Sequence, residues 1–172
     1  MEKTTSARSR TLLLALLISL ILSPIAYAQT VLHQATFESG TDGWTFVSNA
    51  YRYNSALYAT ENNFSLRLYN GSAEVRSPQF ALNAYDKVDL SFQFTNVGYD
   101  TNETFDVEYR PNSSSSWTII GSFIAGSVAG KSADFQSGVP YIDYAKTVTM
   151  FKTDHTFPVS STGQFRFSGN SN

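Results

Sequence analysis

The chain has 172 residues, and its 12 lysines and arginines stand against 14 aspartates and glutamates, for a formal net charge of −2 at pH 7. A chain without a basic excess or a basic cluster argues against a nucleic-acid partner, and nothing in its composition favours an anionic membrane surface. It contains no cysteine, which excludes a disulfide-bonded scaffold, so the fold must be held by its core or by a bound ion.

Residues 1–28 have the pattern of a secretory signal peptide, which we expect to be helical before cleavage. Three basic residues precede an apolar run at 12–22, and the small-x-small motif AYA lies at 26–28. The run is shorter than the roughly 20 residues that span a bilayer, so an uncleaved anchor is the less favoured alternative. We therefore expect a protein that is secreted or held at the cell surface, with the periplasm as the alternative. Residues 29–172 would form one domain of net charge −4 with no membrane span.

The stretch TFESGTDGWTF, residues 36–46, predicts the first element of the mature chain. The apolar residues up to Phe37 indicate a hydrophobic strand. Asp42 and Gly43 then form a typical tight-turn pair, since both residue types tolerate a left-handed backbone.

Apolar and polar residues alternate through most of the remaining chain. In KVDLSFQFTN the apolar set is Val88, Leu90, Phe92 and Phe94, and FSLRLY and ETFDVEYR repeat the pattern with Arg67 and Glu108 on the wet face. SWTIIGSF, KTVTMFK and GQFRFSG are further strand candidates, whereas SPQFALNAYDK indicates a short helical turn at most. Strict alternation is typical of antiparallel sheets with one buried face, so we predict an all-β fold, a sandwich or barrel.

Two connections are candidates for ligand contact. RPNSSSSW, residues 110–117, forms a tip between two strands, and residues 125–144 are the longest irregular segment, a length that is often functional. Tyr141 and Tyr144 lie in this long segment, and with Trp117 they are our predicted ligand-binding residues. The alternative for Trp117, and for Trp44, is packing in or at the rim of the core.

The blocks FESGTDGW, SLRL, SPQFAL, VDLSFQF, ETFDVEY, SW, GSF and FRFSGNSN occur in this order. In this order they resemble a large group of bacterial secreted accessory modules of the jelly-roll type, akin to MAM and galactose-binding-like domains. Such modules accompany secreted hydrolases, peptidases and adhesins. The resemblance implies a jelly-roll β-sandwich over residues 29–172, non-catalytic binding of a carbohydrate or cell-surface polymer, and linked catalytic or adhesin domains.

The resemblance also implies a closing acidic strand beyond Asn172, so the chain looks like a fragment that lacks its last strand. It further implies a structural calcium ion held by that strand, with Glu38 and more weakly Asp42 as ligands from this chain. The alternative is that Glu38 is a solvated strand end and that Asp42 serves the turn.

Catalysis is not expected. Glu103, Asp106 and Glu108 form an E-x-x-D-x-E pattern, whereas laminarinase-like jelly rolls use E-x-D-x-x-E, so a wet sheet face explains these carboxylates better. We predict a non-enzymatic binding module. The alternative is an adhesion sandwich that contacts proteins without a sugar site, and a glycoside hydrolase is a distant third.

Overall fold

The computed structural model describes residues 29–57, 59, 62–69, 71–95, 99–126, 134, 143–151 and 162–171. By its contacts the chain divides into two compact units, residues 1–32 and residues 33–172. Of the first unit only residues 29–32 are described, and they form neither helix nor strand. The expected signal-peptide helix lies outside the described residues.

The described part of the second unit consists of strands and connections, without a helix. The strands are β1 (Thr45–Val47), β2 (Ala50–Asn54), β3 (Phe64–Leu68), β4 (Gly71–Arg76), β5 (Lys87–Thr95), β6 (Thr104–Arg110), β7 (Thr118–Ile124), β8 (Asp143–Phe151) and β9 (Gln164–Ser171). The prediction of an all-β fold is therefore confirmed.

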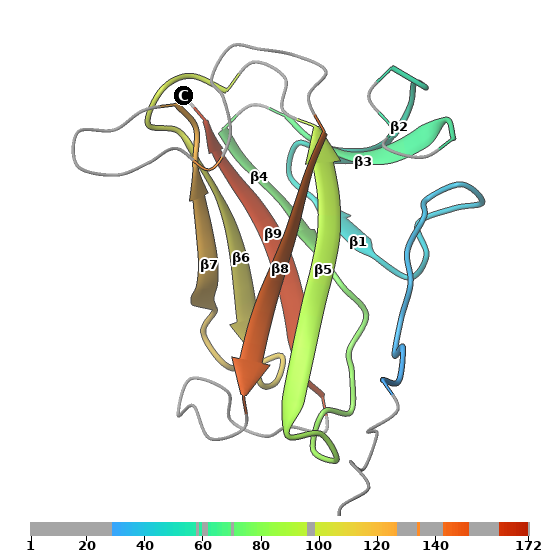
Figure 1. Ribbon diagram of the computed structural model, residues 1–172, viewed down its shortest axis with the longest axis vertical. Coiled ribbons are helices and arrows are strands. Elements are labelled where there is room, and N and C mark those ends of the chain that lie inside the picture. Colours follow the sequence, from blue (N-terminus) through green and yellow to red (C-terminus); the bar gives the residue numbers. More distant parts are fainter. Residues whose placement is uncertain are drawn as a thin grey trace, which may run out of the picture. The chain divides into compact units, whose positions relative to one another are not determined.

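These strands form three antiparallel sheets, as the alternation predicted (Figure 1). One has five strands in the order β1-β4-β9-β6-β7, and the pairs β2-β3 and β5-β8 form two ribbons. The last strand, β9, lies in the middle of the large sheet between β4 and β6. β9 therefore pairs with two strands, β4 and β6, that lie far from it in the sequence.

The β5-β8 ribbon packs across one face of the five-stranded sheet (Figure 1). The ring of Phe92 on β5 has its centroid 5.8 Å from Phe105, 5.8 Å from Phe123 and 5.0 Å from Phe167. Beneath these rings, Val75 and Val107 are completely buried. Large aromatic rings bury much apolar surface, so these ring contacts help to hold the layers together without disulfides.

A second apolar cluster lies beside the first. Its buried members are Leu82, Val88, Tyr109, Met150 and Phe165. They come from β5, β6, β8, β9 and the connection that precedes β5. The inward position predicted for Val88 is thereby confirmed. Tyr109 in this cluster and Val107 in the first cluster are likewise core residues.

The opening of the mature chain differs from the prediction. The turn is confirmed, because Asp42 and Gly43 both have positive φ and Trp44 N donates to Thr41 O at 2.8 Å. The predicted strand up to Phe37 is wrong, since residues 29–37 form no strand and β1 begins at Thr45. The physical reason is that the Asp42 carboxylate accepts the amides of Thr36 and Phe37, at 2.7 and 2.6 Å, in place of a neighbouring strand.

Strands β1, β2 and β4 were not predicted one by one. β1 has three residues, and β4 has only Ala73 and Val75 as an inward pair among polar neighbours. The connection from Ser77 to Asp86 has no helix, only a turn in which Tyr85 N donates to Leu82 O at 3.1 Å.

Among the described residues we find no helix with the length and apolar character needed to cross a membrane.

Candidate functional site

The β2-β3 hairpin carries a tyrosine–arginine surface, formed by Tyr51, Tyr53, Arg67 and Tyr69. Tyr51 pairs directly with Arg67 across the hairpin, and Tyr53 pairs with Ser65. Side chains two residues apart on a strand share a face, so Tyr51, Tyr53, Arg67 and Tyr69 emerge on one side of the ribbon. Tyr51 and Tyr69 are 38% and 46% exposed, among the most exposed large hydrophobic residues in the described chain.

Arg67 lies at the centre of this surface. Its guanidinium carbon is 4.8 Å from the ring centroid of Tyr53, 4.8 Å from that of Tyr69 and 6.0 Å from that of Tyr51. Tyr51 and Tyr53 also meet edge to face, with their centroids 5.9 Å apart. A cation within about 6 Å of an aromatic face is attracted by the ring quadrupole, so the four side chains hold one another in place.

The opposite face of the hairpin is attached to the rest of the molecule. Leu66 and Leu68 pack against the large core, as their alternation with Arg67 predicted. Arg52 donates to Phe37 O through Nε, and to Glu38 O through a terminal nitrogen at 2.5 Å. Its guanidinium carbon also lies 3.3 Å from the ring centroid of Phe64. The hairpin is therefore fixed from behind while its front face stays open.

The predicted calcium ligands Glu38 and Asp42 both bind backbone amides in this structure. Glu38 Oε1 accepts Phe64 N at 2.9 Å and Asn63 N at 3.3 Å, while Asp42 accepts the amides of Thr36 and Phe37. Arg52 places a cation on two neighbouring carbonyl oxygens. In the described part of the chain, no three acidic, histidine or cysteine residues group as metal ligands would. Calcium at Glu38 and Asp42 stays a prediction.

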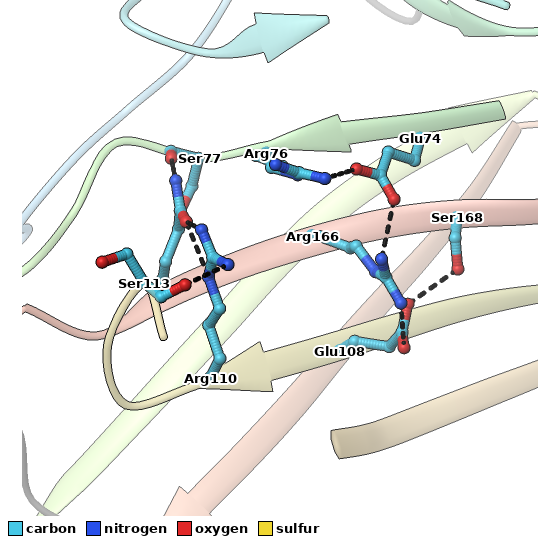
Figure 2. A network of polar contacts seen from close by, with 9 residues as sticks. Glu74, Arg76, Ser77, Glu108, Arg110, Ser113, Arg166 and Ser168 are labelled. Atoms are coloured by element: carbon cyan, nitrogen blue, oxygen red, sulfur yellow. Dashed lines mark hydrogen bonds and ion pairs between the residues drawn. The ribbon is translucent and has the colours of Figure 1, made fainter. Parts of the chain in front are cut away.

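A second polar region, the arginine–glutamate face, covers the side of the five-stranded sheet that points away from the core (Figure 2). Arg166 on β9 donates to both oxygens of Glu108 on β6, at 2.5 and 2.6 Å, and to Glu74 on β4 at 2.7 Å. Glu74 also pairs with Arg76, and Ser168 Oγ donates to Glu108 at 2.9 Å. The network joins three neighbouring strands by their side chains.

The burial of Glu108 differs from the prediction that it lies on a solvent-exposed sheet face. Glu108 does point away from the core, but it is only 7% exposed, so the predicted wet environment is wrong at this position. The reason is that Arg166 and Ser168 lie over it and use its oxygens. Asp106, two residues earlier on the same strand, accepts a hydrogen bond from Ser122 Oγ at 2.5 Å. Both carboxylates thus have protein partners.

Trp117 lies half-buried at the edge of this face, where three guanidinium groups approach its ring. The centroid distances are 4.4 Å for Arg110, 4.7 Å for Arg166 and 5.9 Å for Arg76. Burial and the charges of Arg76 and Arg166 lower the pKa of Arg110. Burial also lowers the pKa of Arg166, but its hydrogen bonds and ion pairs with Glu108 and Glu74 outweigh this, and the net shift is upward. Trp117 thus lies among cations on this outer face, and its role in ligand binding stays a prediction.

The other two predicted ligand-binding residues have different outcomes. Tyr144 belongs to strand β8 and not to the long loop, and its ring stacks on Phe94 with the centroids 5.3 Å apart. It is therefore partly buried against the core. Tyr141 lies outside the described residues. Trp44, weighed as core or rim, is a buried core residue stacked on Phe167 at 5.4 Å.

Comparison with known proteins found no match for the chain among family models, curated proteins or solved structures. The resemblance to MAM-like and galactose-binding-like modules stays a prediction that rests on the quoted motifs.

Sequence reasoning missed the tyrosine–arginine surface as a site. The available signals were the alternating YRY of residues 51–53 and the RLY of residues 67–69. Each motif alone is ordinary, and only the antiparallel pairing of β2 with β3 brings them onto one face.

Proposed function

We propose that this protein is an exported, non-catalytic binding module that binds a carbohydrate or cell-surface polymer through its tyrosine–arginine surface. The observation that carries the proposal is the exposure of Tyr51 and Tyr69 beside Arg67 on a hairpin anchored from behind. Tyrosine offers a rigid apolar face and a polar hydroxyl at a low entropic cost, so exposed tyrosines on a fixed ribbon suit a sugar ring.

The wider architecture that we propose is a jelly-roll β-sandwich. Two facts support it: the β5-β8 ribbon covers one face of the five-stranded sheet, and the strand pairs among the described residues are all antiparallel. Such a scaffold places a ligand surface on rigid strands. The signal-peptide pattern of residues 1–28 supports export to the cell surface or beyond.

Protein–protein adhesion is the second candidate function. The observation that favours it is the same surface, because tyrosine and arginine are enriched where protein interfaces concentrate their binding energy. A carbohydrate ligand is preferred here, since four side chains on a two-stranded ribbon cover less area than a standard protein interface requires.

The proposal is tested by affinity electrophoresis of the purified protein in gels that contain soluble polysaccharides, both neutral and acidic. We expect retardation by at least one of them, with Tyr51→Ala and Tyr69→Ala each weakening it about fivefold, the equivalent of roughly 1 kcal/mol of ring contact. Phe151→Ala is the matched control, because Phe151 is also an exposed aromatic residue, 47% accessible, but lies at the end of β8. Equal retardation of all three variants would assign the binding to another surface.

A further inference from the structure

We propose that the tyrosine–arginine surface selects acidic polysaccharides, those with uronate carboxylates, and that Arg67 is the specificity-determining residue. This inference rests on the proposed function, because it names the class of sugar that the same surface binds. Two observations support it: the aromatic rings around Arg67, and the oxygen partners that the other described arginines have.

The described part of the chain contains five arginines, and four of them have oxygen atoms of the protein as partners. Arg166 and Arg76 pair with glutamates. Arg110 donates to Gln164 Oε1 at 3.0 Å and to Ser113 O at 3.0 Å, and Arg52 donates to two backbone carbonyls. Within the described residues, Arg67 alone has ring contacts and neither a carboxylate partner nor another acceptor.

Within the described part of the chain, no oxygen acceptor uses the hydrogen-bonding capacity of Arg67. An aromatic face attracts the positive charge, but it does not replace the oxygen acceptors that a guanidinium prefers. Arginine presents five N–H donors in a planar fork, which matches the two oxygens of a carboxylate. The surface therefore combines a cation already held in position with free donors, the complement of a carboxylate on a ligand.

The tyrosines beside Arg67 indicate which kind of ligand bears that carboxylate. Tyr51 lies across the hairpin from Arg67, and Tyr69 lies two residues further along the chain, so exposed rings flank the cation on two sides. A pyranose ring that bears a carboxylate offers an apolar face for a tyrosine and an anion for Arg67 at a short separation. In a polyuronate this unit repeats along the chain, so neighbouring units can rebind the same surface.

The decisive experiment compares one polysaccharide with and without its charges. Polygalacturonate and its fully methyl-esterified form have the same sugar backbone, and binding of each to the purified protein is measured by calorimetry. We expect the acidic form to bind at least about tenfold more tightly, the equivalent of 1.4 kcal/mol. Arg67→Gln should weaken binding of the acidic form far more than binding of the esterified form, so that the two forms bind within about twofold of each other. Arg67→Lys should retain only part of the preference, because it keeps the charge but loses the planar fork.

The matched control is Lys87→Gln, which removes one positive charge at an exposed position of β5, away from the hairpin. If Lys87→Gln lowers acidic binding as much as Arg67→Gln does, general charge attraction explains the result and the inference is overturned. If both forms of the polysaccharide bind equally, the inference fails and the proposed function stands. If the protein binds no polysaccharide but retains a protein ligand, both fail. Circular dichroism of each variant, with Arg67→Lys as the milder substitution, separates lost binding from lost folding.

Discussion

Arg52 connects the candidate site with the chain that precedes β1. Its guanidinium reaches the carbonyl oxygens of Phe37 and Glu38, and the Glu38 carboxylate in return accepts the amide of Phe64 at the start of β3. These contacts satisfy backbone groups that have no sheet partner, because residues 29–37 form no strand. One side chain on the inner face of β2 therefore replaces ladder hydrogen bonds that a strand would have supplied.

We predict that Arg52→Ala lowers the free energy of unfolding by about 1–3 kcal/mol, because it leaves two carbonyl oxygens without a partner. Arg52→Lys should give an intermediate loss, since an ammonium group cannot bridge both oxygens as the fork does. Urea unfolding followed by tryptophan fluorescence measures this. Arg67→Ala is the control on the opposite face of the same hairpin, and it should cost only about 0.5–1 kcal/mol from its lost ring contacts. Equal losses for the two arginines would contradict the anchoring role of Arg52.

At the scale of elements, the residue that precedes β9 packs tightly against the second core cluster. β9 enters the sheet through Gly163, which bridges to Phe80 before the strand begins. A Cβ atom at Gly163 would lie 2.8 Å from Tyr109 Oη and 2.9 Å from Leu82 Cδ1, both in the second core cluster. No side chain fits there without displacing buried neighbours.

Gly163→Ala should therefore destabilise the protein by about 1–3 kcal/mol, the usual cost of overpacking a core. The measurement is the shift of the urea midpoint at constant m-value. Gly40→Ala is the matched control, because a Cβ there meets no atom within 4 Å and Gly40 has no left-handed backbone. A neutral effect at Gly163 would mean that the start of β9 can shift away from Tyr109.

The alternation of apolar residues predicted most of the longer strands. β5, β6 and β9 show it because each has one face in the core. The short strands β1 and β4 escaped prediction because β1 has three residues and β4 needs only two small apolar ones to fill its inner face. The opening strand was mispredicted because a local side chain, Asp42, competes for the backbone amides that a strand would need.

At the scale of the whole molecule, the core restricts the titration of two tyrosines. Burial, and then the negative charges of Glu103 and Asp106, raise the pKa of Tyr99 to about 12. Burial raises the pKa of Tyr109 to about 12 as well. In the unfolded chain both phenols would titrate near the ordinary value of about 10.

Stability should therefore fall on the alkaline side. Because the folded pKa lies above the unfolded pKa, this contribution is fully present below about pH 10 and is lost as the pH rises towards about 12. Each tyrosine contributes at most about 1.4 kcal/mol per pH unit in that window. Thermal unfolding between about pH 8 and pH 11.5 should show the decline, and Tyr99→Phe should make it shallower. An unchanged slope in Tyr99→Phe would mean that the Tyr99 phenol is open to solvent.

The sequence by itself determined the fold class, the antiparallel pairing and the turn at Asp42-Gly43, because these depend on local periodicity and local backbone preference.

Only the tertiary structure decided which residues share a surface. Tyr51 and Arg67 are distant in sequence and meet through strand register. Glu74, Glu108 and Arg166 meet because β9 is inserted between β4 and β6. Trp117, predicted as a ligand contact, lies beside the arginines of the outer sheet face. Tyr144, predicted likewise, packs on Phe94 at the core. The residue type fixes the charge and the hydrogen-bonding groups of a side chain, whereas pairing between distant strands determines which partners it has.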